Sequence, residues 1–419
     1  MDHFSYQTGI LHAEDVSLAD VAEAVGTPCY VYSSATLRRH ARVFAEALSV
    51  LPSVHIAFAV KANPNLAVLR LLASEGYGAD VVSAGEMDRA LKAGVAPEHV
   101  VFSGVGKTAD ELTRALKAGI GQFNLESEEE GVELAEIAAA LGLTASAALR
   151  VNPDVDAGTH AKISTGMAEN KFGVAYDRAA GIYGRLSALP GLSMRGLAVH
   201  IGSQLSRLEP LEDAFTKMGE LMRAIRAQGD TITHMDLGGG VGVPYKPGDS
   251  FPSPQQYGAM VARVTADWGV TLMFEPGRII AGNSGVLITR VVRVKEGVNA
   301  PFVVVDAAMN DLARPALYGA WHDFLAVKPD GGTFTANIVG PICESSDTFA
   351  MGRQIDTVKA GDLAVFRTAG AYGATMANTY NSRALVPEVM VEGDKWAIVA
   401  KRIDPATILA AEDVPAWLK

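Results

Sequence analysis

Short apolar runs alternate with amphipathic helical segments eight times between residues 54 and 275. Each run is four to eight residues long, the usual length of a strand that is buried on both faces. An open sheet rarely carries so many β/α repeats, so the pattern predicts a closed (β/α)8 TIM barrel. The expected strands are Val54–Val60, Ala79–Val82, His99–Ser103, Gly121–Leu125, Ala145–Asn152, Arg195–His200, His234–Leu237 and Leu272–Glu275.

Three of the intervening helices begin with a Ser or Thr that is followed three residues later by Glu. This spacing predicts a capping box, in which each side chain accepts a hydrogen bond from the other residue's backbone N–H. The three pairs are Ser83 with Glu86, Thr108 with Glu111, and Ser127 with Glu130.

Beyond residue 284 the chain is rich in Val, Ile and Thr and carries few convincing helices, which predicts an all-β domain of Greek-key or sandwich type. We therefore expect a barrel over residues 36–283, a C-terminal β domain over 284–419, and an N-terminal segment, 1–35, whose strand-like Cys29–Tyr32 joins the β domain. The other strands expected in the β domain are Gly285–Lys295, Phe302–Asp306, Thr333–Val339, Leu363–Phe366 and Lys395–Ala400.

Charge and composition exclude several classes of function. The 419 residues carry a net charge of −11, which argues against a nucleic-acid-binding surface. Met1–Gln7 lacks the basic and apolar regions of a secretory signal, and no apolar run approaches the roughly 18 residues of a membrane span. The two cysteines, Cys29 and Cys343, form neither a disulfide framework nor a metal-binding spacing. We expect a cytoplasmic protein that binds neither membranes nor structural metal.

Lys61 follows directly after the first expected strand, and Pro64 prevents the regular structure from continuing. An amine at the rim of an apolar barrel is partly desolvated, so it releases its proton more readily and attacks an aldehyde better. An isolated lysine at a strand end more often reaches out to solvent. The rest of the chain decides between these two interpretations.

Glycine-rich sequence follows the last two expected barrel strands, where TIM barrels often bind phosphate. Gly238, Gly239 and Gly240 come after the seventh strand, and Gly277-Arg278 comes after the eighth. Adjacent glycines let backbone N–H groups approach phosphate oxygens closely, although such a run is also common in turns without a ligand. The glycine spacing fits neither a Rossmann fingerprint nor a P-loop.

A Schiff-base lysine after strand one, opposite a phosphate site after strands seven and eight, suggests pyridoxal 5'-phosphate. Glu275, at the end of the eighth strand, would keep the pyridine nitrogen protonated. His200 ends the sixth strand, and a lone histidine there is either a structural residue or a platform that stacks on a planar cofactor.

In the β domain, Cys343 and Glu344 belong to a tight polar cluster that runs to Asp347. The cluster is either a turn around one cysteine or a thiol acid/base beside a carboxylate that recognises an ammonium group. Three other residues have the character of ligand-facing loop residues but are weak signals alone: Arg314, Tyr318 and Tyr372.

Together these motifs resemble the fold-type III pyridoxal-phosphate decarboxylases, which share an alanine-racemase-like barrel, and within them the diaminopimelate decarboxylases. The resemblance spans nearly the whole chain. It rests on Tyr30–Tyr32, Ala59–Asn63, Gly78–Ser83, Arg150–Pro153, Lys171–Gly173, His200–Gln204, Gly238–Gly240, Glu275–Arg278 and Cys343–Asp347.

The resemblance implies a pyridoxal-phosphate-dependent lyase that converts meso-2,6-diaminopimelate into L-lysine and carbon dioxide, the last step of lysine biosynthesis. Lys61 would bind the cofactor covalently, His200 would stack on its ring, and Glu275 would pair with its nitrogen. The residues implied for the cofactor phosphate are Ser203, Gly239, Gly277, Arg278 and Tyr372. Those implied for the far end of the substrate are Arg278, Arg314, Tyr318, Glu344 and Tyr372.

The resemblance also implies that Cys343 gives a proton to the substrate carbon after carbon dioxide leaves. In the family this cysteine comes from the partner subunit, so a homodimer with shared active sites is expected. Three alternatives stay open: a decarboxylase for another amino acid, a non-catalytic pyridoxal-phosphate carrier, and a Schiff-base aldolase without cofactor. The long Pro153–Gly173 and Lys246–Pro254 connections are expected to be functional loops.

Overall fold

The computed structural model describes residues 2–156 and 170–418. These residues form two compact units. The first contains the chain up to Leu37, a short piece Tyr245–Asp249, and everything from Ala281 onward. The second contains Arg38–Pro244 and Ser250–Ile280.

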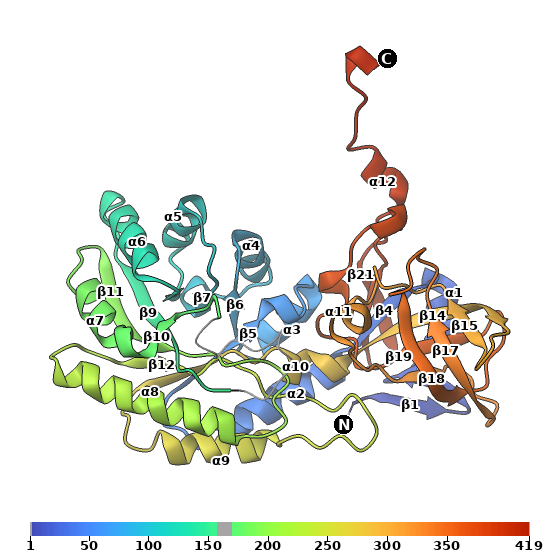
Figure 1. The fold of residues 1–419 in the computed structure, drawn as a ribbon, viewed down its shortest axis with the longest axis horizontal. Helices are drawn as coiled ribbons and strands as arrows, with labels where there is room; N and C mark the ends of the chain where they lie inside the picture. The colour runs from blue at the N-terminus through green and yellow to red at the C-terminus, as the bar shows by residue number, and fades with distance from the viewer. Residues whose placement is uncertain (1, 157–169, 419) are drawn as a thin grey trace. The chain divides into compact units, whose positions relative to one another are not determined.

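The second unit is a closed barrel of eight parallel strands, as predicted. In the described residues the strands pair in the order β5-β6-β7-β8-β9-β11-β12-β13, and β13 pairs with β5 to close the ring (Figure 1). A short strand, β10 (Val174–Ala175), adds to β9. The barrel strands are β5 (Val54–Ala59), β6 (Gly78–Val81), β7 (Val100–Phe102), β8 (Gln122–Leu125), β9 (Ala145–Asn152), β11 (Leu192–Ala198), β12 (His234–Asp236) and β13 (Thr271–Phe274).

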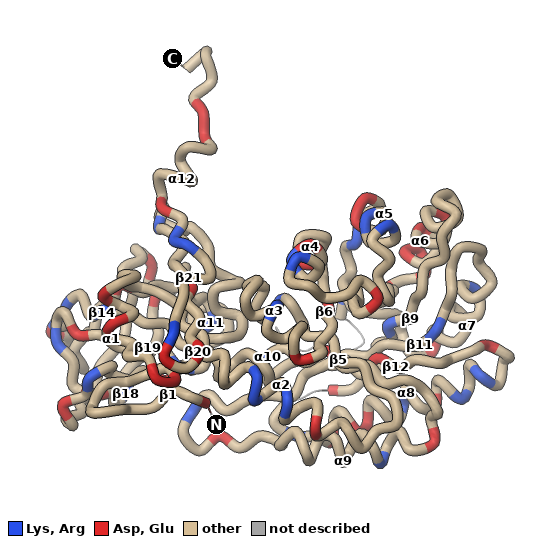
Figure 2. Tube along the Cα trace, turned by 180° about the vertical axis from the view of Figure 1, so that it is seen from behind, with Lys and Arg blue, Asp and Glu red and all other residues tan. Residues whose placement is uncertain are grey.

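Helices cover the outside of this ring (Figure 1). They bury apolar side chains against the strands, as Leu112 and Leu134 do, and keep charged residues outside. Figure 2 shows acidic and basic segments alternating on these helices, and an ion pair of 2.7 Å between Arg114 and Asp88 joins two of them. The helices are α2 (Ser34–Leu48), α3 (Leu66–Ser74), α4 (Ala84–Lys92), α5 (Ala109–Ala118), α6 (Glu128–Ala140), α7 (Tyr176–Ser187), α8 (Glu209–Ala227) and α9 (Pro254–Val264).

The expected capping boxes are only partly present. Thr108 and Glu111 form the complete reciprocal pair at the start of α5. Ser83 and Ser127 also cap their helices, but the glutamate of each pair accepts from the backbone N–H one residue before the cap. In the second case the side chain of Glu130 is also held by Lys107 at 2.6 Å, a contact that no local pattern reveals.

The first unit is built from β-sheet, which confirms the predicted second domain. Its larger sheet runs in the order β18-β17-β15-β14-β4-β20-β21, and β19 pairs with β14 and β16. The strands are β4 (Cys29–Ser33), β14 (Gly285–Lys295), β15 (Phe302–Val305), β16 (Phe324–Ala326), β17 (Thr333–Val339), β18 (Thr348–Asp356), β19 (Leu363–Phe366), β20 (Glu388–Glu392) and β21 (Lys395–Ala400).

Strand β4 comes from the N-terminal segment and lies between β14 and β20, which come from the far end of the chain. Its side chains are all buried, and Val31 packs in one apolar core with Ile288 and Val389. A separate small sheet precedes it, with strands β1 (Phe4–Gln7), β2 (Ile10–Ala13) and β3 (Val16–Ser17). The helices of the first unit are α1 (Leu18–Val25), α11 (Arg314–Tyr318) and α12 (Pro405–Leu409). Helix α10 (Arg278–Ala281) includes the chain position at which the barrel unit ends and the first unit resumes. Among the described residues, no helix is both long and apolar enough to span a bilayer.

Candidate active site

The carboxyl ends of the barrel strands bring together several of the predicted site residues. Lys61 lies in a single 3-10 turn, Val60–Ala62, directly after β5. His200 follows β11, and Glu275 follows β13. Because parallel strands present their carboxyl ends at one mouth of a barrel, these side chains share one region of the second unit.

Lys61 forms an ion pair with Asp80, which belongs to β6. The lysine Nζ lies 2.9 Å from Asp80 Oδ2, and the Asp80 side chain is completely buried. The lysine side chain is 40% exposed, so its amine is held in place yet remains open to a ligand. The other oxygen, Asp80 Oδ1, is buried and accepts no hydrogen bond from the described residues.

Glu275 lies within a buried hydrogen-bond network inside the barrel. Asn124 Nδ2 is 3.2 Å from Glu275 Oε1 and 2.9 Å from Asp236 Oδ2, so one amide contacts both acids. Ser103 Oγ lies 3.3 Å from the same Glu275 oxygen. Burial raises the pKa of the Glu275 carboxyl well above its usual range, and the negative charges of Asp236 and Asp80 raise it further.

His200 is held by the glycine loop. Its Nδ1 accepts a hydrogen bond of 3.3 Å from the backbone N–H of Gly239. Burial lowers the pKa of His200 to about 3, and the positive charges of Arg150 and Lys61 add to this effect. The imidazole is therefore neutral at physiological pH, so a flat, uncharged ring is presented beside the lysine.

Hydrogen bonds join the loop after β11 to the glycine loop after β12. The side-chain amide of Gln204 donates to Val243 O at 2.6 Å and accepts from Val243 N–H at 3.2 Å. Leu205 N–H donates to Gly240 O at 2.9 Å. Ser203, one residue before Gln204, is thereby fixed beside the glycine loop.

The glycine loop leaves no room for a side chain at Gly239, where a Cβ atom would lie 2.3 Å from Glu275 O. Gly240 adopts a φ of +123°, which side chains rarely allow. Gly277 and Arg278 follow Glu275 and are both buried. Pro276 O accepts from Ala59 N–H at 3.1 Å, which fixes this turn next to the end of β5, two residues before Lys61.

Arg314, in the first unit, is buried among aromatic rings. Its Nη1 donates to His322 Nε2 at 2.9 Å, and its guanidinium lies over the Tyr245 ring at 4.6 Å. Tyr318 is at the other end of the same short helix, α11, one helical turn away. Tyr372 has a φ of +56°, a conformation that is uncommon for a tyrosine and that often marks functional loops.

The predicted cysteine cluster is a turn that Asp347 organises. The buried carboxylate of Asp347 accepts from the backbone N–H groups of Met309 and Ile342, each at 2.7 Å. This arrangement leaves Cys343 and Glu344 exposed. Glu344 Oε2 accepts from the Tyr380 hydroxyl at 2.8 Å, a partner that sequence reasoning missed.

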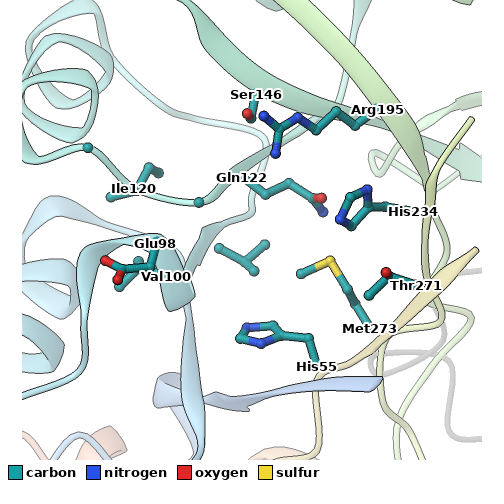
Figure 3. Close-up of a pocket in the computed structure, with 13 residues that line it drawn as sticks. His55, Glu98, Val100, Ile120, Gln122, Ser146, Arg195, His234, Thr271 and Met273 are labelled. Carbon is teal, nitrogen blue, oxygen red and sulfur yellow. The ribbon is translucent and has the colours of Figure 1, made fainter. Parts of the chain in front are cut away.

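The opposite mouth of the barrel holds a pocket of about 420 Å³ at the amino ends of the strands. Figure 3 shows His55, Gln122, His234 and Met273 directed toward this space. Lys61, His200 and Glu275 do not line it. In TIM barrels chemistry takes place at the carboxyl ends of the strands, so we assign the candidate active site to the mouth with Lys61.

Sequence reasoning assigned no role to Asp80, Asn124 or Asp236, although all three are buried around Glu275 or Lys61. The signal lay in the strict alternation of polar and apolar residues in β8, where Gln122 and Asn124 share one face. In the long connection from Pro153 to Gly173, residues 157–169 lie outside the described part of the chain. Its last residue, Gly173, donates its N–H to Glu126 Oε2 at 2.8 Å.

The residues at the carboxyl mouth fit pyridoxal phosphate. Lys61 would supply the amine for its aldehyde, Glu275 an acid for its ring nitrogen, and His200 an uncharged ring. The glycine loop provides backbone N–H groups and no side chains at its closest approach. The unsatisfied Asp80 Oδ1 would gain a partner from a donor group on the ligand.

Comparison with known proteins agrees with this fit. Residues 34–282 match the family described as "Pyridoxal-dependent decarboxylase, pyridoxal binding domain". The chain is 51% identical to the diaminopimelate decarboxylase of Zymomonas mobilis over 99% of both proteins. It is similar to the crystal structure of diaminopimelate decarboxylase from M. jannaschii in complex with L-lysine, with a TM-score of 0.96, 33% identity and coverage of 100% and 99%. The Helicobacter pylori diaminopimelate decarboxylase, also solved with L-lysine, has a TM-score of 0.91, 38% identity and coverage of 94% and 98%.

We expect the His200 imidazole to stay neutral from pH 8 down to pH 5. Its folded pKa of about 3 lies below the unfolded value of about 6.5. The folded protein therefore binds fewer protons in that interval, and the stabilisation is complete above pH 6.5 and is lost as the pH falls toward 3. The ring Cε1 resonance, assigned with a His200→Asn variant, should not shift between pH 5 and 8. A midpoint between pH 6 and 7 would contradict the burial described above.

Proposed function

The chain belongs to the diaminopimelate decarboxylases, within the pyridoxal-dependent decarboxylase family, and we propose that the barrel mouth at Lys61 is the site of its reaction. The reaction is the decarboxylation of meso-2,6-diaminopimelate to L-lysine and carbon dioxide, the last step of lysine biosynthesis. The enzyme is a lyase that depends on pyridoxal phosphate. The observation that carries the assignment of the site is the amine of Lys61, paired with Asp80 at the same barrel mouth as Glu275 and His200.

When bound, the cofactor supplies an electron sink for the electrons of the bond between the substrate α-carbon and its carboxylate, which breaks in the reaction. Lys61 holds it through the aldehyde, His200 packs on its ring, and Glu275 pairs with the ring nitrogen. Backbone N–H groups of the two loops orient its phosphate, together with Arg278. The residues proposed for the phosphate are Ser203, Gly239, Gly277, Arg278 and Tyr372.

The substrate residues proposed are Arg278, Arg314, Tyr318, Glu344 and Tyr372. Arg278, Arg314 and Tyr318 bind the distal carboxylate of the substrate, and Glu344 binds its distal ammonium. A guanidinium suits a carboxylate because it donates two parallel charge-assisted hydrogen bonds. Arg314 is supported by its fixed position, since His322 and the Tyr245 ring hold its side chain before any ligand arrives. Ornithine lacks that carboxylate, so this clamp favours diaminopimelate.

We further propose that the enzyme is a homodimer with shared active sites, in which Cys343 and Glu344 serve the barrel of the partner subunit. The exposure of both side chains on one ordered turn supports this role. Cys343 then gives a proton to the substrate α-carbon after carbon dioxide has left. In this proposal the functional domains are the barrel at 36–283 and a β domain formed by 1–35 and 284–419.

We also propose that the enzyme works in the cytoplasm on a small amino-acid substrate and binds neither nucleic acid nor membranes. The net charge of −11 supports this proposal, because a polyanion would be repelled by much of the surface.

Replacing Lys61 with alanine should abolish the covalent link to pyridoxal phosphate. Borohydride should label a peptide containing Lys61 in the parent enzyme and label no lysine in Lys61→Ala, and carbon dioxide release should fall by about 10³-fold or more. An exposed control, Lys359→Ala, should keep both the label and the activity. Labelling of a different lysine in the parent enzyme would overturn the assignment.

Substitutions at the clamp should act on the substrate's distal carboxylate. We expect Arg314→Ala to lower kcat/KM for meso-diaminopimelate by about 10²-fold, and Tyr318→Phe to lower it by about 5-fold, as for the loss of a charged and a neutral hydrogen bond. The exposed Arg293→Ala is the control. If well-folded Arg314→Ala and Tyr318→Phe enzymes release carbon dioxide from meso-diaminopimelate at the parent rate, these two residues do not bind its distal carboxylate.

Mixing two inactive variants tests the shared sites. In an equimolar mixture of Lys61→Ala and Cys343→Ala, about half of the dimers should be mixed, and each should hold one intact site. Subunit exchange should therefore restore about a quarter of the parent activity. A mixture that exchanges subunits, as seen by native mass spectrometry, but stays inactive would place Cys343 and Lys61 of each site in one chain.

A further inference from the structure

Asp236 and Glu275 form a pair of neighbouring acids with a single amide between them. Asn124 Nδ2 contacts one oxygen of each acid, at 2.9 Å and 3.2 Å. Asp236 is 1% exposed and is otherwise held by the backbone N–H of Gly238, at 2.9 Å. Asp236 is buried and Glu275 is half-buried, so two ionised carboxylates that share one amide donor repel each other strongly.

Among residues 2–156 and 170–418, no second positive charge is paired with these two acids. Asp80 on β6 adds a third carboxyl, and the nearby cation, Lys61, is already paired with it. Lys107 reaches the Asn124 backbone oxygen but is paired with Glu130. Tyr257 on α9 also faces Asp236 and is a neutral phenol, since burial holds its pKa well above its usual range. The excess negative charge is relieved when one proton binds to the pair.

The hydrogen-bond donors around the pair can nevertheless stabilise both acids in their ionised form. The Asn124 amide has two hydrogens and points its nitrogen at both carboxyl groups. The Gln122 side-chain amide donates to Asn124 Oδ1 at 2.8 Å, which fixes which side of the Asn124 amide faces the acids. Figure 3 shows Gln122 at the opposite mouth of the barrel, so the network runs through the barrel interior.

We propose that Asp236 and Glu275 share one proton in the cofactor-free enzyme, and that this proton passes to the cofactor's ring nitrogen when the cofactor binds. This inference rests on the proposed function, because it needs Glu275 to face that nitrogen. The O–H bond of the shared acid breaks and an N–H bond forms at the ring. Both acids are then ionised, and the positive charge of the protonated ring compensates part of their negative charge.

Asn124 is a positioning residue in this step. Its amide stabilises the two carboxylates once the proton has left, and it does not touch the ring itself. Burial raises the pKa of both carboxyl groups, which favours retention of a proton at neutral pH.

Proton exchange with the buffer on cofactor binding tests the proposal. Pyridoxal phosphate is titrated calorimetrically into the cofactor-free enzyme in two buffers of different ionisation enthalpy. The pH is set where an absorbance titration shows the free ring nitrogen to be unprotonated. Asp236→Asn removes one of the two charges that retain the proton, and loss of the infrared carboxylic-acid band in the cofactor-free variant would show that the proton has left. That variant should then take up about one more proton per site from the buffer than the parent enzyme. A band that persists in Asp236→Asn would show that Glu275 keeps the proton alone, which overturns the sharing. The exposed Asp88→Asn is the control and should match the parent.

Equal proton uptake by folded Asp236→Asn and the parent enzyme would overturn the inference. If the parent enzyme forms no covalent link with the cofactor at Lys61, the proposed function fails instead, so the two failures are distinguishable.

Asn124→Leu provides a second variant that keeps both acids. We expect it to bind pyridoxal phosphate about ten-fold more weakly, with an unchanged proton count, since only the ionised pair loses its donor. Parent-like affinity in Asn124→Leu would remove Asn124 from the mechanism. A raised folded pKa means that the folded state binds more protons than the unfolded state above about pH 4.5, so the pair contributes stability to the cofactor-free parent that is lost as the pH rises. The free energy of unfolding should therefore rise more steeply with pH in Asp236→Asn than in the parent. Equal slopes would count against a shared proton.

Discussion

Three carboxyl groups, two of them fully buried, lie at one mouth of a closed barrel, and this is the constraint on which the site depends. Asp80, Asp236 and Glu275 cannot all be ionised there without partners, because a buried charge costs several kcal/mol unless it is paired or hydrogen-bonded. Lys61 offsets the charge of Asp80, and Asn124 contacts the other two. Lys61 is thus part of the arrangement that stabilises the acids, and Asp80 in turn holds the Lys61 amine in place.

Backbone geometry sets the rest of the site. The glycine loop approaches Glu275 so closely that a side chain at Gly239 would collide with its carbonyl oxygen. Gln204 joins the neighbouring loop to it through a pair of side-chain hydrogen bonds. These contacts are local to the barrel unit, which also contains Lys61, His200 and Glu275. In the other unit, Arg314 is likewise fixed by its own neighbours, His322 and Tyr245.

The barrel could be predicted from sequence because each of its strands is a short apolar run with a helix behind it. The strand-end position of Lys61 followed from the same pattern. The small sheet of β1 to β3 was missed, as was β18, whose segment Thr348–Asp356 mixes polar residues with Gly352 and has no clean alternation. The roles of Asn124 and Asp236 depend on strand register, which brings residues more than a hundred positions apart into contact. No local motif carries that information.

The position of β4 affects the order in which the two units can fold during translation. This strand is made among the first thirty-odd residues, yet both of its neighbours, β14 and β20, are translated more than 250 residues later. The last barrel strand, β13, is complete at Phe274, just before β14 begins at Gly285, so the nascent barrel can collapse before β20 is made. Strand β4 is apolar and has two unpaired edges until β14 and β20 are made. We therefore expect chaperones to bind it during synthesis.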